Sequence, residues 1–118
     1  MRERSERRKL PRVATPLLIE FPHPETAQRE RSFTQDITEA GMRFPTRVKL
    51  QIGQGLPLSL TLTGRPATLR TMGEVIWLRE IARHGAAQYE VGVRFQWIDD
   101  PDRQQLAQHL GATFPQPP

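Results

Sequence analysis

Residues 89–97 read Tyr-Glu-Val-Gly-Val-Arg-Phe-Gln-Trp, so that apolar side chains alternate with polar or small ones along the whole segment. Successive side chains of a β-strand point to opposite faces of a sheet, and this period of two therefore predicts a strand with one buried face. The face that carries Tyr89, Phe95 and Trp97 is expected to be the buried one. Residues 56–62 repeat the pattern with leucine at every second position. The two segments predict a mainly β protein.

Four further segments bring the predicted number of strands to six. Runs of β-branched, aliphatic and aromatic residues at 17–21 and 75–78 are interpreted as strands buried at least partly on both sides. Shorter candidates lie at 31–35 and 42–44, separated by turn-forming residues at 36–41. Six short strands in an open sheet would leave exposed edges, so we expect a small six-stranded antiparallel β-barrel.

One helix is predicted after the last strand. Asp100 suits the N-cap and Pro101 the first helical position. Leu106 and Leu110 lie one turn apart and form a single apolar stripe. Gly111 is expected to end the helix, because glycine commonly follows the last helical residue.

The excess positive charge of the 118-residue chain is concentrated at one end. The chain has 17 basic and 13 acidic residues, a formal net charge of +4. Residues 1–12 hold six of the basic and two of the acidic residues, and the other 106 residues hold eleven of each. We therefore expect a flexible basic arm over residues 1–12, one neutral domain over residues 13–112, and a loose tail over residues 113–118.

The residue types disfavour several classes of function. The chain has no cysteine, which excludes disulfides, thiolate metal sites and cysteine nucleophiles. Its three histidines, at positions 23, 84 and 109, do not have the spacing of metal ligands. No run of residues approaches the roughly 20 apolar residues of a membrane span. We expect a cytoplasmic protein that is not an enzyme, binds no metal and has no cofactor.

Three short motifs follow one another along the chain. Residues 8–12 have the form RxxxR, residues 36–41 the form DxTxxG, and residues 92–95 the form GxRF. Each has an ordinary explanation by itself: a solvated basic terminus, a turn, and a core strand. In the turn, Asp36 and Thr38 would bond to nearby backbone amides, and the final glycine would take a positive φ.

In this order and with these separations, the three motifs resemble the PilZ domain, the bacterial receptor family for the second messenger cyclic di-GMP. The resemblance covers nearly the whole chain. It implies a split β-barrel with a C-terminal helix, and a ligand site formed by Arg8, Arg12, Asp36, Thr38 and Gly41. The second arginine of the family motif directly precedes the first strand, which selects the pair at 8 and 12. Threonine stands at position 38 where the family has serine.

Two further residues enter the expected ligand site. Arg7 precedes the arginine motif and can add a phosphate or guanine contact. Trp77 corresponds to a strand from which some family members contact the ligand, and its indole can stack on guanine. The alternative for Trp77 is an ordinary core position. Arg94 belongs to the third motif, but a solvated strand arginine explains it equally well, and it is left out of the site.

The chemistry of cyclic di-GMP suits these residue types. Its two phosphates and the O6 and N7 edges of its guanines match the charge and planar fork of arginine, while aspartate accepts from guanine N–H donors. Binding is expected to order the arm and to alter a surface that a partner protein recognises. Two alternatives stay open: a small barrel that binds nucleic acid through its basic arm, and a PilZ-like adaptor that acts only through protein contacts.

Overall fold

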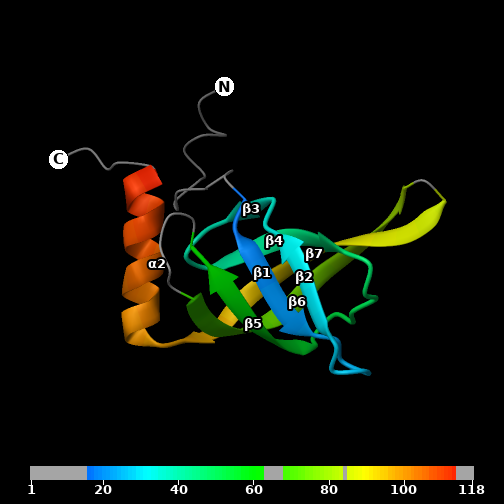
Figure 1. The fold of residues 1–118 in the computed structure, drawn as a ribbon, viewed down its shortest axis with the longest axis horizontal. Helices are drawn as coiled ribbons and strands as arrows, with labels where there is room; N and C mark the ends of the chain where they lie inside the picture. The colour runs from blue at the N-terminus through cyan, green and yellow to red at the C-terminus, as the bar shows by residue number, and fades with distance from the viewer. Residues whose placement is uncertain (1–15, 63–67, 84, 114–118) are drawn as a thin grey trace.

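The computed structural model describes residues 16–62, 68–83 and 85–113, which form a curled antiparallel sheet and a helix. Figure 1 shows the sheet as a half-barrel, with the helix beside one end and the hairpin of the two longest strands projecting from the other. The strand order is β2-β1-β5-β6-β7-β4-β3. The elements are β1 (Leu18–Pro22), β2 (Arg29–Phe33), β3 (Asp36–Ile37), β4 (Gly41–Thr46), β5 (Gly55–Thr61), β6 (Thr68–Arg83), β7 (Ala86–Ile98) and α2 (Asp100–Thr113).

The predicted fold class, a mainly β barrel with a C-terminal helix, is confirmed, and each of the six predicted strands is present. The additional strand, β3, lies inside the segment predicted as a turn. Its two residues pair with Arg43 and Met42 of β4, so the turn itself spans only residues 38–40. The predicted arm over residues 1–12 lies outside the described residues, as do residues 114–118 of the predicted tail.

The core fills the concave side of the sheet. Alternate residues of β4 and β5 are buried, as the period of two requires, and Leu106 and Leu110 of α2 join the same apolar cluster. The rings of Phe21 and Phe44, which are both buried in this cluster, lie with centroids 5.8 Å apart. The two ends of the sheet meet where the Ser32 hydroxyl of β2 donates to the carbonyl oxygen of Pro45 in β4. This hydrogen bond joins β2 to β4 across the open side of the curled sheet.

Two irregularities in the pairing of β6 with β7 overturn two expectations about burial. Met72 pairs with Trp97 but Gly73 pairs with Phe95, so Gln96 is an extra residue in β7. An extra residue reverses which face the following side chains occupy, and Trp97 is 56% exposed instead of buried. Ile76 is likewise an extra residue in β6, and it and Trp77 are both exposed. The expectation that residues 75–78 are buried at least partly on both sides was therefore wrong for Ile76 and Trp77, whereas Val75 is buried and Leu78 is partly buried.

The helix is present, but its ends differ from the prediction. The N–H of Arg103 donates to the carbonyl oxygen of Asp99 at 2.8 Å, which makes Asp99 the N-cap and places Asp100 inside the helix. The helix continues through position 111 to Thr113. The predicted glycine stop was wrong, because glycine in a helix interior is only mildly unfavourable and does not end a helix by itself. The carboxylate of Asp102 accepts the N–H of Arg70 and so fixes the start of α2 to β6.

Candidate functional site

The outer face of β3, β4, β7 and β6 carries a row of four residues that lie opposite one another. Asp36 of β3 is paired with Arg43 of β4. Arg43 is also opposite Gly92 of β7, and Gly92 is opposite Trp77 of β6. Residues opposite each other in antiparallel strands have Cβ positions about 4.5–5.5 Å apart and share a face of the sheet. Four positions that are distant in sequence thus form one surface.

The turn between β3 and β4 borders this row. The N–H of Thr38 donates to the carbonyl oxygen of Gly41 at 2.9 Å, and the N–H of Ala40 donates to Oγ1 of Thr38 at 3.0 Å. The carbonyl oxygen of Ala40 accepts the N–H of Phe95 at 2.9 Å, which fixes the turn to β7. Because Oγ1 of Thr38 accepts this bond, its hydroxyl hydrogen can be directed towards a ligand.

Gly41 is required for a reason other than the one predicted. Among the described glycines, only Gly53 and Gly85 have a positive φ, so the expectation of a positive φ at Gly41 was wrong. A Cβ at Gly41 would lie 2.2 Å from the backbone carbonyl oxygen of Val93. The glycine therefore allows β4 to approach β7 closely at the point where the turn joins the row.

Gly92 plays a comparable part for Trp77. A Cβ at Gly92 would lie 2.2 Å from Nε1 and 2.4 Å from Cε2 of the indole. The absence of a side chain lets the indole lie across the backbone of β7. The extra residue in β6 turns both Ile76 and Trp77 outward, with 47% and 37% of their surfaces exposed. A bulge beside a site commonly redirects a side chain in this way.

Together these residues line a groove of about 410 Å³. Four of the residues predicted for the ligand site line it: Asp36, Thr38, Gly41 and Trp77. The other three predicted site residues, which are the arginines at positions 7, 8 and 12, lie outside the described residues. The volume falls within the range of about 300–1,000 Å³ that is usual for small-molecule sites.

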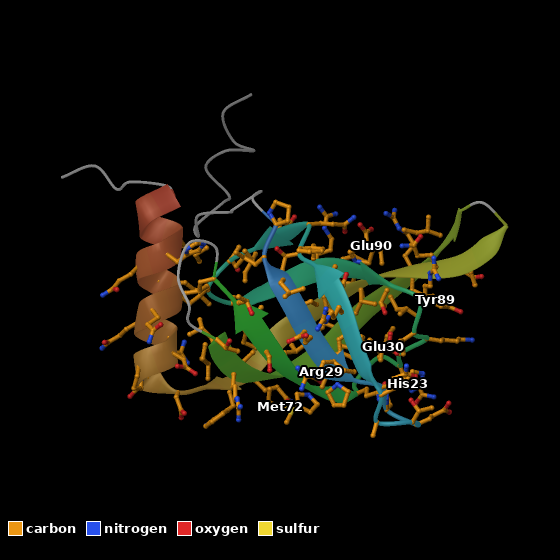
Figure 2. The ribbon with its side chains drawn as sticks, viewed as in Figure 1. His23, Arg29, Glu30, Met72, Tyr89 and Glu90 are labelled. Carbon is orange, nitrogen blue, oxygen red and sulfur yellow. The ribbon has the colours of Figure 1, made fainter. Side chains whose placement is uncertain are left out.

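An alternating chain of charges supports the groove. Nη2 of Arg43 lies 2.9 Å from Oδ2 of Asp36, and Nη1 of Arg43 lies 3.8 Å from Oε2 of Glu90. Glu90 is 4% exposed, and its Oε1 lies 2.5 Å from Nη2 of Arg79, the opposite residue in β6. Figure 2 labels Glu90 towards the upper edge of the barrel. Arg43 is thus held between two carboxylates, and it holds Asp36 in place.

Among the residues that line the groove, sequence reasoning missed Arg43 and Ile76 and set Arg94 aside. Arg94 is also ion-paired with Glu74. Arg43 alternates with buried Met42 and Phe44, so its outward direction could have been predicted from the period of two. Its position opposite Asp36 could not, because this depends on the pairing register. Nothing in the local sequence marks Ile76 as an extra residue.

A second groove, of about 480 Å³, lies where β1, β5, β6 and the end of β7 meet. None of the described residues predicted for the ligand lines it. Within residues 16–62, 68–83 and 85–113, no group of three or more His, Asp or Glu side chains could hold a metal ion. The helix described here is not long and apolar enough to cross a membrane.

Several solved structures resemble this one. The PilZ domain of YcgR from Escherichia coli, solved with c-di-GMP, has a TM-score of 0.66 and 16% identity, with 91% of this chain and 90% of that chain covered. MotI, an inhibitor of motility from Bacillus subtilis, has a TM-score of 0.72 and 18% identity over 91% of this chain and 51% of its own.

MrkH from K. pneumonia, solved as a complex with c-di-GMP, has a TM-score of 0.74 and 15% identity over 91% of this chain and 52% of its own. The chain thus spans about half the length of MotI and MrkH. At these identities the likeness concerns the fold. No protein with a curated description matches the chain in sequence.

The family comparison covers almost the whole sequence. The family model described as the PilZ domain matches residues 4–112, which include the three motifs, the sheet and most of α2. The chain therefore belongs to the PilZ domain family.

Proposed function

We propose that this protein is a receptor that binds cyclic di-GMP in the groove between the β3–β4 turn and Trp77. The observation that carries the proposal is the convergence of Asp36, Thr38, Gly41 and Trp77 on one groove, although the last of them lies 36 residues beyond the others in the chain. Membership of the PilZ family supports it, as do the similar structures of YcgR and MrkH that were solved with c-di-GMP.

The residues of the groove have distinct roles in this proposal. A carboxylate has about four lone-pair sites, so Asp36 can accept guanine N–H groups while Arg43 remains bound to its Oδ2. The Thr38 hydroxyl donates to a guanine or phosphate acceptor. The indole of Trp77 stacks on a guanine, an interaction of about 1–3 kcal/mol for a base on an aromatic ring. Each group acts by binding, and the ligand is released unchanged.

The phosphates of the ligand require positive charge. Arg8 and Arg12, with Arg7, supply it from the N-terminal segment, where the guanidinium fork can also bind the O6 and N7 edge of guanine. Arg43 and Arg94 add positive charge on the groove itself. We further propose that closure of the arginine segment over the ligand changes the surface that a partner protein recognises.

Calorimetry of the full chain with cyclic di-GMP tests the proposal. We expect saturable binding with a micromolar or lower Kd, and a loss of most of the affinity in Arg8→Ala, Arg12→Ala and Asp36→Ala. Arg4→Ala is the matched control, because it removes an arginine of the same segment that the motif register leaves out. Absence of heat at high protein concentration would refute the receptor function. A loss in Arg4→Ala as large as in Arg12→Ala would refute the register alone.

A further inference from the structure

The second groove is the larger of the two described above, and it lies on another part of the sheet. Its lining includes Pro22 of β1, Pro57 of β5, Met72 of β6 and Trp97 of β7. Met72 is paired with Pro57 on one side and with Trp97 on the other, so the three residues form a continuous apolar row. Figure 2 shows Met72 and Arg29 towards the lower edge of the barrel. No residue lines both grooves.

The exposure of Trp97 results from the irregular pairing of β7 with β6. The extra residue Gln96 reverses the alternation of β7, so that Ile98 is buried and Trp97 is 56% exposed. The hydroxyl of Thr71 donates to the carbonyl oxygen of Trp97 at 2.5 Å and fixes the strand at this point. A large exposed apolar side chain beside other apolar residues is typical of an interaction site.

The rim of the groove is also held in shape. It includes Ala27, whose φ of 62° is uncommon for a residue other than glycine. The turn around Ala27 is fixed by His23, whose backbone carbonyl accepts the N–H of Ala27 at 2.9 Å and whose N–H donates to Gln28 at 2.7 Å. Nδ1 of His23 accepts the N–H of Glu25 at 3.0 Å. A rim fixed in this way loses little conformational freedom when a partner binds.

The charges around the groove are mainly positive. Arg29 and Arg70 line it with one acid, Glu20. That carboxylate is shared, since its Oε1 lies 3.2 Å from Nη1 of Arg29 and its Oε2 lies 2.9 Å from Nε of Arg31. The side chains of Arg29 and Arg31 are 69% and 70% exposed. The groove therefore combines an apolar row with an excess of arginine.

We propose that this groove docks an acidic segment of a partner protein. An apolar or aromatic side chain of the segment packs on Trp97 and Met72, and its carboxylates pair with Arg29 and Arg70. The composition favours a protein over a nucleic acid, because Trp, Met and Arg are enriched at protein interfaces. The inference does not rest on cyclic di-GMP binding, since the two grooves share no residue.

Selection of peptides on the folded full chain tests this inference. A random 12-residue peptide library is panned against the wild-type protein and against the double variant Arg29→Glu, Arg70→Glu. We expect the wild type to enrich peptides with Asp or Glu beside a large apolar residue, and the double variant to enrich peptides with Lys or Arg instead. Selection of the same peptides by both proteins, or of basic peptides by the wild type, would overturn the proposal.

A synthetic copy of an enriched peptide then locates the contact by fluorescence anisotropy. Trp97→Ala should weaken its binding at least about tenfold, as expected for a hot-spot residue. Trp97 is exposed, so this variant should keep the wild-type unfolding transition. Trp77→Ala is the matched control, because it removes an exposed indole from the other groove, and it should bind the peptide as the wild type does. Equal affinities for all three proteins would overturn the assignment of the groove.

Two measurements distinguish other occupants. Sedimentation of the wild type that shows a dimer, together with a monomeric Trp97→Ala variant, would assign the groove to a second copy of this chain and overturn the proposal. Binding of an oligothymidylate that Trp97→Ala abolishes would overturn it in favour of a nucleic acid. We expect neither result. The wild type and Trp97→Ala should sediment alike, and Trp97→Ala should leave any oligonucleotide binding unchanged.

Discussion

Replacing Gly92 by alanine should displace the indole of Trp77 while leaving the stability of the fold nearly unchanged. A Cβ at position 92 would lie 2.2 Å from Nε1 of the indole. Ordinary contact begins at 3.4 Å, so the indole must retreat by about 1.2 Å, which is the difference between these two distances. Trp77 is 37% exposed, and it can move into solvent without displacing the core.

The expected magnitudes follow from this geometry. A displaced rotamer costs about 0.5–1.5 kcal/mol, and alanine in place of glycine within a strand recovers about 0.5–1 kcal/mol. The free energy of unfolding of Gly92→Ala should therefore change by less than about 1 kcal/mol. Affinity for cyclic di-GMP should fall by about 1–3 kcal/mol, the contribution of one stacked base, which corresponds to about 5-fold to 150-fold in Kd.

Calorimetry and chemical denaturation of four proteins provide the assay: the wild type, Gly92→Ala, Trp77→Ala and the double variant. Because alanine at position 92 acts through the indole, it should cause no further loss of affinity once Trp77 has been removed. Wild-type affinity in Gly92→Ala would refute the stacking role of Trp77. An equal loss from Gly92→Ala in both backgrounds would refute the proposed route through the indole.

Three further changes test other parts of the structure. Gly41→Ala should destabilise the fold by about 1–3 kcal/mol, because its Cβ would meet the backbone of Val93 at 2.2 Å, and an unchanged denaturation midpoint would contradict this close approach. Thr38→Ser should bind cyclic di-GMP at least as tightly as the wild type, whereas Thr38→Val should bind more weakly because valine has no hydroxyl. Equal affinities of Thr38→Val and the wild type in calorimetry would remove Thr38 from the site. Glu90→Gln should lower the free energy of unfolding by about 1–3 kcal/mol, because it removes a buried carboxylate beside Arg43, and a denaturation curve identical to the wild type's would show that the pair contributes nothing.

Side-chain burial was predictable from alternation in the sequence wherever the pairing of the strands is regular. The leucines at alternate positions of β5 are all buried, because side-chain direction in a regular strand follows directly from sequence position. The prediction failed at Ile76 and Gln96, since an extra residue reverses the faces without changing the composition of the segment. Trp97 was therefore assigned to the wrong face.

The candidate site was predictable in part. Asp36 and Thr38 belong to a short motif whose spacing is visible in one sequence, and Trp77 was proposed from family resemblance. The role of Gly41 was misjudged, because the close approach to Val93 is a tertiary contact. Arg43 was missed for a similar reason, since its ion pair with Asp36 depends on the register of β3 against β4. Contacts between strands depend on the pairing register and cannot be predicted from the local sequence.

The most direct test of the central claim is an NMR titration of the full chain with cyclic di-GMP. We predict saturable shifts of the backbone amides of Asp36, Thr38 and Gly41 and of the indole N–H of Trp77, with a micromolar or lower Kd. The signals of the N-terminal arginine segment should shift in parallel. Absence of saturable shifts, or shifts confined to the groove around Trp97, would contradict the account.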